Sequence, residues 1–487
     1  MSDLDNEKIE ASPAGDGLEV VIIGGGLCGL LTGMLLAGDG HDVLVLERDP
    51  AEPPAQATEA WHGWERRSIR QFHMGHFFLP RFRTELDAHL PRVIDALAEA
   101  GAISLNPIQS MPEELSGGWR DGDERFEALT GRRPVVEATV AGCAAATDRL
   151  TIRRGVTVAA LVTSPITTAD GASTVHVAGI ETGDGEVIAA DLVVDAAGRN
   201  SGLPRLLAAA GAKAPVDEAD DSGFVYYGRT FRSDDGSTPP AFGGGLQAYG
   251  SISTLTLAAD NGTWQIAIVA SGRDATIRRA RHEDAFEKLW RSYPLVAHWL
   301  DGEPLSDIEV MANLEDRIRR FVVDGVPVAT GLAAVGDSWA CTNPSVGRGA
   351  SMALMHAVAL RQHLREQPID DPVAWSLAWD QRTATSVEPF FRETIRADRH
   401  RLAQIEAAID GQDYATDDLT HAFGEALPTA AMQDPTALRA WLDTFMLHRL
   451  VDDVMSDEAF VGRVLELGSN REPAPGLTRA ELEAVLA

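Results

Sequence analysis

Residues 18–49 read LEVVIIGGGLCGLLTGMLLAGDGHDVLVLERD. Residues 18–23 form a continuous apolar run, rich in β-branched side chains, which is typical of a buried parallel strand. A helical pattern follows over 27–37, residues 38–40 end it, and 42–46 is a second apolar run. This order predicts a strand, a helix and a second parallel strand, the βαβ unit of an α/β fold.

The turn between this strand and helix is rich in glycine and reads GGGLCG. In this GxGxxG pattern Gly24 permits the tight turn, Gly26 lets the backbone approach a pyrophosphate, and Gly29 allows close helix–sheet packing. Leu27 and Cys28 open the helix, whose free N–H groups and dipole favour an anion. We therefore expect a dinucleotide phosphate site; the alternative is an ordinary turn between a strand and a helix.

An acidic residue closes the second strand. Glu47 follows Gly29 by 18 residues, and its carboxylate can accept hydrogen bonds from a ribose diol. Arg48, next to it, is included in the expected site. The sequence holds no second fingerprint: the three glycines at 243–245 lie among strands with no helix after them, which is typical of a loop or bulge. These patterns predict one bound dinucleotide, either FAD or NAD.

A second glycine-rich segment, AVGDSWACTNPSVGRGAS at 334–351, distinguishes these two cofactors. Together with the early glycine turn and DAAGRNS at 195–201, it resembles the FAD-dependent monooxygenases of the p-hydroxybenzoate hydroxylase-like superfamily. The resemblance spans residues 18–365. It implies FAD as the cofactor and NAD(P)H as a transient electron donor.

The resemblance also gives roles to residues of the second segment. Asp337 is expected to contact the ribityl chain of FAD, and the backbone at Gly347 and Gly349 to lie near the pyrimidine edge of the flavin. Reduced flavin carries negative charge at that edge, which the N–H groups of a helix N-terminus stabilise. Pro344 is expected to fix a rigid backbone over the ring. Pro344, Gly347 and His76 are the candidates nearest the flavin, and no residue is assigned acid–base chemistry.

A narrower likeness lies in RRSIRQFHMGHFF, residues 66–78. This segment is similar to an Arg-x-Gly-Val-Pro-Gln-x-x-x-x-His loop in a branch that includes polyene epoxidases. Arg66, Gln71 and His76 match that loop, whereas Ser68 and an arginine replace its glycine and proline. The likeness implies Arg66 at the FAD phosphates or ribityl oxygens and His76 in the active site. A solvated arginine and a packed histidine are the alternatives.

Two further positions are included in the expected cofactor site by resemblance. Arg133 precedes a helical pattern and matches an Arg-x-x-x-Glu position that reaches the cofactor; a surface ion pair with Glu137 is the alternative. Val162 is expected to pair its main chain with adenine at the end of a strand over 156–162. Cys341 lies inside the flavin segment but has no partner cysteine at fixed spacing, so we expect a packed thiol.

The expected architecture is a Rossmann-like α/β domain that binds FAD, an inserted β-rich substrate domain and a helical C-terminal region. The expected divisions are a disordered N-terminus at 1–16, the FAD domain at 17–220 and 310–375, the substrate domain at 221–309 and the helical region at 376–487.

Several local signals support these divisions. Gly183-Asp184-Gly185 and Asn261-Gly262 are expected hairpin turns. Pro91 marks a break or a new first turn in a helical stretch, and Thr478 with Glu481 forms a capping box for a last helix.

Composition excludes other classes of protein. The net charge of −31 argues against a nucleic-acid partner, and because the sequence holds no run of 18 apolar residues and starts with an acidic, polar stretch, we expect neither a membrane span nor a secretory leader. Cysteines at 28, 143 and 341 lack metal-ligand spacing, so no metal is expected, and their odd number suits a reducing cytoplasm.

The resulting hypothesis is an FAD-dependent monooxygenase. It would insert one oxygen atom from O2 into a mostly apolar small molecule, by hydroxylation or epoxidation through a flavin C4a-hydroperoxide. A homo-oligomer and a separate flavin reductase are open as partners. The alternatives are a flavin-dependent reductase or dehydrogenase acting on carbon–carbon double bonds, and a non-enzymatic flavoprotein. A flavin halogenase is disfavoured because no lysine lies between Lys8 and Lys213.

Overall fold

The computed structural model describes residues 17–69, 71–168, 171–469 and 475–487. The segment expected to be disordered, 1–16, lies outside the described residues, as does Arg70. Among the described residues, every helix is too short or too polar to span a lipid bilayer. The described part of the chain also holds no group of three or more His, Cys, Asp or Glu side chains arranged to bind a metal ion.

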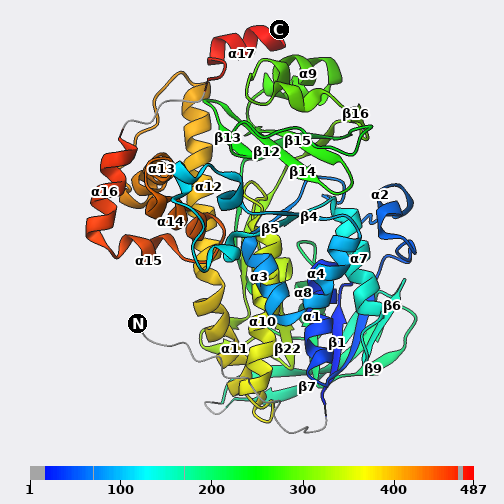
Figure 1. Ribbon diagram of the computed structural model, residues 1–487. Coiled ribbons are helices and arrows are strands. Elements are labelled where there is room, and N and C mark those ends of the chain that lie inside the picture. Colours follow the sequence, from blue (N-terminus) through cyan, green and yellow to red (C-terminus); the bar gives the residue numbers. More distant parts are fainter. Residues whose placement is uncertain (1–16, 70, 169–170, 470–474) are drawn as a thin grey trace.

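A parallel sheet of five strands forms the base of the molecule (Figure 1). The predicted βαβ unit supplies its centre, β1 (Glu19–Ile23) and β2 (Asp42–Glu47), joined by α1 (Leu27–Gly38). The full order is β22 (Leu332–Ala334), β10 (Leu192–Asp195), β1, β2 and β6 (Leu150–Arg154). The expected α/β fold class is therefore confirmed.

Helix α1 is apolar on all sides because it is covered on all sides. It contacts the sheet, α7 (Arg133–Ala145) and α10 (Arg348–Glu366). Its residues from Leu30 to Ala37 are all buried. A helix that is hydrophobic all round belongs in a core, and this burial fixes the orientation of the glycine turn that precedes it.

An antiparallel sheet forms the upper layer (Figure 1). Its order is β13 (Leu246–Ala248), β14 (Ile252–Ala259), β15 (Thr263–Ser271), β12 (Phe224–Arg232) and β16 (Glu303–Pro304), with β17 (Glu309–Met311) also paired to β12. Asn261 (φ 53°) and Gly262 (φ 67°) connect β14 to β15 as the hairpin signal predicted.

One face of the antiparallel sheet is covered by helices. Tyr227 and Ile268 pack there against α9 (Glu283–Arg291) and the last helix, α17 (Arg479–Leu486). Tyr226 points to the opposite face, as strand alternation requires. The capping box of Thr478 and Glu481 opens α17 as expected, but α17 joins the core of this sheet rather than the other C-terminal helices.

The remaining C-terminal helices pack beside the two layers. They are α11 (Pro372–Ser386), α12 (Glu388–Ile409), α13 (Leu419–Ala431), α14 (Pro435–Phe445), α15 (Val451–Met455) and α16 (Glu458–Gly468). Helix α11 contacts the parallel sheet, α12 contacts the antiparallel sheet, and α13 to α16 pack against one another. Helix α12 runs beside both sheets (Figure 1), and Arg401 on it donates to the Tyr249 carbonyl at 2.7 Å.

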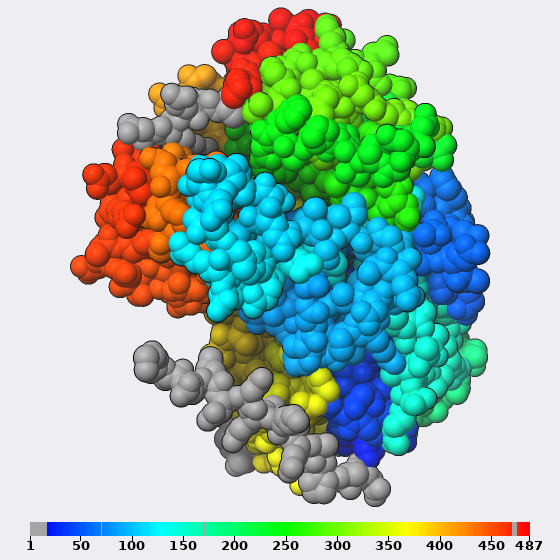
Figure 2. Space-filling view, viewed as in Figure 1, coloured from blue at the N-terminus to red at the C-terminus, as the bar shows by residue number. Residues whose placement is uncertain are grey.

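The C-terminal helices also pack against the segment around residues 103–127, and Figure 2 shows this cyan segment beside the orange and red helices. The Arg439 guanidinium lies 2.6 Å from the Asp123 carboxylate, and Arg125 lies 2.8 Å from Asp443. These ion pairs hold the C-terminal region against the body of the molecule.

Smaller elements complete the fold. The stretch with Pro91 is divided into α3 (Pro80–His89) and α4 (Pro91–Glu99), so the proline begins a new helix. The hairpin at Gly183–Gly185 joins β8 (Ser173–Thr182) to β9 (Val187–Ala189) as expected, and β8 also pairs with β7 (Val158–Thr167). The others are α2 (Ala60–Gly63), β3 (Phe77–Phe78), β4 (Ile103–Leu105), α5 (Pro107–Ser110), α6 (Glu113–Ser116), β5 (Ala128–Thr130), α8 (Leu203–Ala209), β11 (Val216–Asp221), β18 (Glu315–Arg320), β19 (Val322–Val323), β20 (Val326–Pro327), β21 (Ala329–Thr330) and β23 (Ala340–Cys341).

Candidate active site

Three segments far apart in sequence meet at one edge of the parallel sheet. The Ala196 amide donates to the Ile23 carbonyl, and the Val335 amide donates to the Asp195 carbonyl, both at 2.9 Å. Because the carboxyl ends of parallel strands share an edge, the early glycine turn, the DAAGRNS segment and the Gly336-Asp337 turn become neighbours. Ligands of open α/β sheets bind in the crevice at this edge.

A continuous cavity of about 1580 Å³ extends from this edge to the antiparallel sheet. Pockets for small ligands usually enclose 300–1,000 Å³, so this cavity has room for a dinucleotide and a second molecule. The expected site residues on its wall are Gly24, Gly26, Leu27, Cys28, Glu47, Arg48, Arg66, His76, Arg133, Asp337, Pro344, Gly347 and Gly349.

The early glycines have geometries that match the roles expected of them. Gly24 has φ +109°, and a Cβ atom there would lie 2.6 Å from the Ala196 carbonyl oxygen. A Cβ atom on Gly29 would lie 1.9 Å from the Gly24 carbonyl oxygen, so Gly29 is buried beneath the turn rather than on the cavity wall. At Gly26, by contrast, a Cβ atom would meet nothing within 4 Å. The open space in front of Gly26, at the N-terminus of α1, fits a phosphate.

Glu47 and Arg66 form a buried ion pair beside the turn. The Arg66 Nη2 atom lies 2.7 Å from Glu47 Oε2, which also accepts a hydrogen bond of 2.9 Å from the Gly25 amide. The same guanidinium lies 3.3 Å from Asp49 and 3.5 Å from Glu137, and Arg66 is only 4% exposed. Arg66 is therefore not a solvated arginine; it joins the glycine turn, the end of β2 and helix α7.

Asp337 presents a carboxylate that no protein group neutralises directly. Among the described residues, no donor forms a hydrogen bond to this carboxylate, although it lines the cavity. Burial raises the pKa of Asp337, while the guanidinium groups of Arg199, Arg133 and Arg317 act to lower it. An unsatisfied acceptor in a cavity requires donors from a ligand. The hydroxyl groups of a ribityl chain are donors of this kind.

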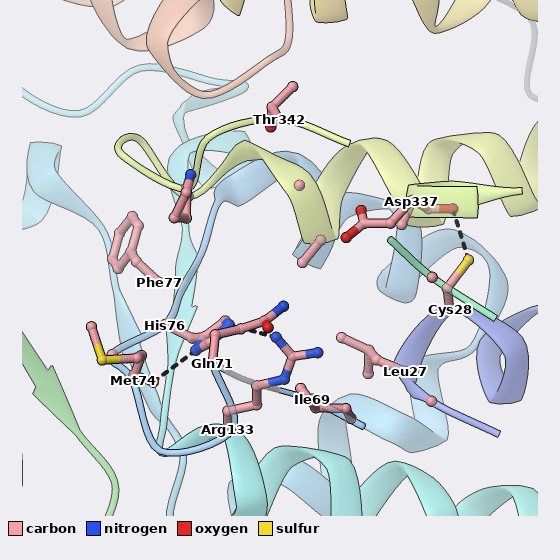
Figure 3. A pocket seen from close by; sticks show the side chains of 18 of the residues that line it. Leu27, Cys28, Ile69, Gln71, Met74, His76, Phe77, Arg133, Asp337 and Thr342 are labelled. Atoms are coloured by element: carbon pink, nitrogen blue, oxygen red, sulfur yellow. Dashed lines mark hydrogen bonds between the residues drawn. The ribbon is translucent and has the colours of Figure 1, made fainter. Parts of the chain in front are cut away.

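Cys28 lies beneath the same part of the cavity. Its Sγ atom is 3.8 Å from the Ala353 carbonyl oxygen, and burial raises the pKa of the thiol to about 12. Figure 3 shows Leu27 and Cys28 below Asp337. Cys28 is therefore a packed, protonated thiol, and so is Cys341, whose pKa burial raises to about 11.

The second glycine segment forms the N-terminus of α10. Gly347 caps this helix at φ +69°, and its amide donates to the Pro344 carbonyl at 3.0 Å. A Cβ atom on Gly349 would meet nothing within 4 Å, so the first turn of the helix is open to the cavity. Arg348 points the other way, and its Nη1 atom lies 3.4 Å from Glu393.

A buried polar network holds the loop before α10. The Tyr226 hydroxyl donates to Asn343 Oδ1 at 2.7 Å, and the Ser345 hydroxyl donates to Asp398 Oδ1 at 2.6 Å. The main-chain amide of Asn343 donates to Asp316 Oδ1 at 2.6 Å. The network links the antiparallel sheet and α12 to the loop that carries Pro344, which is how both layers fix its position.

His76 and Arg133 point toward one another at the cavity wall (Figure 3). The His76 Nδ1 atom lies 2.8 Å from the Met74 carbonyl oxygen, and His76 Nε2 lies 2.8 Å from Arg133 Nη1. Burial and the charge of Arg133 lower the pKa of His76 to about 3. His76 is therefore a neutral imidazole that donates from Nδ1. Arg133 also forms the alternative ion pair, with its Nε 2.6 Å from Glu137.

Val162 requires a correction, because it is not on the cavity wall. Its register partner in the β7–β8 pair is Gly179, and the wall is formed instead by Val156, Thr157 and Val158. The strand expected over 156–162 corresponds to β7, which begins at Val158, whereas the preceding strand, β6, ends at Arg154. The chain leaves β6 at the sheet edge, where the Val156 amide donates to the Glu47 carbonyl at 3.0 Å.

Several cavity residues were not predicted. The loop around Gly243–Gly245 and the far C-terminal helices both line it, the latter through Met432, Trp441, Leu442, Phe445 and Met446. Glu309 on β17 is another. An isolated acidic residue in a short β-rich segment gives no sequence signal for a cavity, and contacts made by a distant helix give none either.

Comparisons with known proteins agree with this geometry. A family model described as FAD binding domain matches residues 17–74. Protein Rv3254 of Mycobacterium tuberculosis (strain ATCC 25618 / H37Rv) is 26% identical over 367 residues, which cover 71% of this chain and 72% of that protein.

Two solved structures share the fold at low identity. PqsL, a probable FAD-dependent monooxygenase from Pseudomonas aeruginosa, has a TM-score of 0.57 at 16% identity, covering 80% of this chain and 99% of PqsL. 2-Methyl-3-hydroxypyridine-5-carboxylic acid oxygenase has a TM-score of 0.51 at 16% identity, covering 82% of this chain and 92% of the oxygenase. The motif-based expectation of an FAD-binding domain agrees with the family model, and the chain shares its fold with PqsL and with this oxygenase.

Proposed function

We propose that this chain is an FAD-dependent monooxygenase that inserts one oxygen atom from O2 into a mostly apolar small molecule. The observation that carries the proposal is the single cavity that joins the Gly26 turn, Asp337 and the start of α10 to the apolar face of the antiparallel sheet. A cofactor bound along the Gly26 turn, Asp337 and the start of α10 would contact a substrate bound against the antiparallel sheet. PqsL, a probable FAD-dependent monooxygenase, has the same fold.

The residues present fit FAD along the length of the cavity. The N-terminus of α1 at Gly26 would hold the pyrophosphate, Glu47 the ribose, and Asp337 the ribityl hydroxyls. The N–H groups at the start of α10, next to Gly349, would stabilise negative charge at the pyrimidine edge. When bound, FAD supplies the redox chemistry with NAD(P)H and O2. The protein supplies binding, orientation and exclusion of water.

The substrate end of the cavity is suited to an apolar molecule. Leu246, Leu255 and Leu257 line it from the sheet, and Met74 lines it from the loop that carries His76. Two arginines of the loop that carries His76 are engaged in ion pairs: Arg66 with buried carboxylates, and Arg67 with Glu65 at the surface. Hydroxylation of an aromatic compound and epoxidation of a polyene both suit such a wall.

The test starts from the purified protein loaded with FAD. We expect it to retain flavin, to oxidise NAD(P)H faster when a suitable apolar substrate is added, and to give a product that carries one ¹⁸O atom from ¹⁸O₂. Full product yield without oxygen would instead identify the rival reductase or dehydrogenase of carbon–carbon double bonds. Loss of all flavin on gel filtration would contradict both.

Three partner and location assignments belong to the same proposal. NAD(P)H oxidation is measured with and without an added flavin reductase. If the chain reduces its own FAD, it oxidises NAD(P)H without the reductase; if it depends on a partner, oxidation requires the reductase. Sedimentation tests for a homo-oligomer; the oxygenase that shares the fold has been solved in a tetrameric form. The free cysteines Cys28, Cys143 and Cys341 support a cytoplasmic location.

A further inference from the structure

Glu309 carries an unpaired carboxyl group into the substrate end of the cavity. It lies on β17, where its register partner on β12 is Gly228. Because Gly228 has no side chain, nothing on β12 stands directly opposite Glu309. Facing residues on paired strands share a face, and this face is the one toward Met74, whose Cε atom would lie 3.2 Å from a Cβ atom on Gly228. Both Glu309 and Met74 line the cavity.

Within the described part of the chain, no side chain or main-chain group forms a hydrogen bond or ion pair with the Glu309 carboxyl. Two buried carboxyls elsewhere in the protein, by contrast, are paired with arginine: Asp260 lies 2.6 Å from Arg132, and Asp274 lies 2.5 Å from Arg479. Burial raises the pKa of Glu309 to about 7, and no neighbouring charge contributes to that pKa. An unpaired acid in a cavity is costly to the fold and is a candidate for ligand binding.

Of the cavity carboxylates in the described residues, Asp337 is also without a donor, and it lies at the proposed cofactor end. The two acids therefore mark two different ligands in one cavity. The neighbouring strands and the loop after β17 also give the cavity wall apolar side chains, Met311, Leu314 and Leu255. A substrate at this end would therefore find both hydrophobic contact and the Glu309 carboxyl as a hydrogen-bond acceptor.

We propose that Glu309 is a specificity-determining residue that accepts a hydrogen bond from a hydroxyl or amino group on an otherwise apolar substrate. This inference rests on the proposed function, because it assumes that the substrate occupies the end of the cavity away from Asp337. A donor on the substrate satisfies the carboxylate, whereas a substrate carboxylate is repelled by it. The substrate class is thereby narrowed to apolar molecules that carry a donor and no acid.

The test compares two bicyclic probes that differ in one donor. 2-Naphthol and 2-methoxynaphthalene are titrated into the FAD-loaded enzyme without NAD(P)H, and binding is followed by the change in flavin absorbance. A hydrogen bond to a charged acceptor corresponds to about tenfold or more in affinity. At a pH above 7, where the Glu309 carboxyl is ionised, we expect 2-naphthol to bind the native enzyme about tenfold more tightly, and Glu309→Leu to lose this preference. Asp307→Asn removes an exposed acid from the same segment and is the matched control.

A third probe and a second variant keep the inference testable if Glu309→Leu does not fold. Glu309→Gln keeps the size of the side chain and removes its charge, so 2-naphthoate should bind it about tenfold more tightly than it binds the native enzyme. A native enzyme that retains FAD but does not prefer 2-naphthol overturns the inference and leaves the proposed function standing. The same holds if Asp307→Asn changes the preference as much as Glu309→Leu does. A protein that retains no FAD overturns the proposed function, and this inference with it.

Discussion

Gly336 is packed so closely against Cys28 that a Cβ atom added to Gly336 would lie 2.8 Å from the Cys28 sulfur. This contact joins the two glycine segments, one at each end of the domain that holds the parallel sheet. Gly336 also has φ +60°, a conformation that side chains other than glycine rarely adopt. The cofactor end of the cavity therefore depends on the absence of a side chain at this position.

Gly336→Ala tests that dependence. Steric overlap with Cys28 and the left-handed backbone should lower the free energy of unfolding by about 1–3 kcal/mol and weaken FAD binding. Denaturant unfolding and flavin content measure the two effects. Gly38→Ala, at the open end of α1, is the control, since a Cβ atom there meets nothing within 4 Å. Equal stability of the two variants would contradict the packing.

Gly26→Val should weaken FAD binding without the loss of stability expected for Gly336→Ala. The space in front of Gly26 is open, so the substituted protein should fold with nearly native thermal stability in the absence of FAD, yet bind FAD far more weakly. Gly142→Val places the same side chain on an equally open glycine of α7, away from the cavity. If both variants retain flavin equally, the pyrophosphate does not bind at Gly26.

Asp337→Leu separates cofactor binding from stability. Removing a carboxylate without a donor should make the FAD-free protein no less stable, because burial of that charge is unfavourable. FAD binding should weaken by about tenfold or more if the carboxylate accepts hydrogen bonds from the ribityl chain. Fluorescence titration of the FAD-free protein with FAD gives the affinity. Unchanged affinity would remove Asp337 from the cofactor site.

Asp398 should make stability depend on pH. Burial, reinforced by the charge of Asp316, raises its pKa to about 7, while hydrogen bonds from Ser345 and Asn343 act to lower it. The folded pKa is above the unfolded value of about 3.9, so the protonated form stabilises the fold. That contribution is complete below pH ~4 and is lost as the pH rises toward about 7.

Asp398→Asn should flatten this dependence. The difference in unfolding free energy between native protein and variant, measured by urea unfolding across that range, should change by on the order of 3 kcal/mol. Other acids contribute equally to both proteins and cancel in the difference. A difference that does not vary with pH would show that Asp398 is ionised in the folded protein throughout.

Local sequence was sufficient for the features that depend on a few neighbouring residues. The hairpin turn at Asn261-Gly262 and the capping box of Thr478 follow from the preferences of a few adjacent residues, and the βαβ unit follows from the apolar pattern of residues 18–46; all three are present. The resemblance to known FAD-dependent monooxygenases also predicted the overall fold. It could be recognised in the sequence because Asp337 and the glycines on either side of Arg348 lie at fixed spacing within one segment.

Packing between distant segments settled the rest. Arg66 is a buried bridge rather than a solvated side chain because Glu47 and Glu137 converge on it from β2 and α7. Val156 rather than Val162 lines the cavity because β6 joins the parallel sheet and ends at its edge. Helices α14 and α17 reached the cavity and the antiparallel sheet, respectively, from the end of the chain. The pattern of neighbouring residues predicts which face of a helix or strand is apolar. Only the tertiary structure determines which other element packs against that face, and the wall of a cavity depends on how those elements pack.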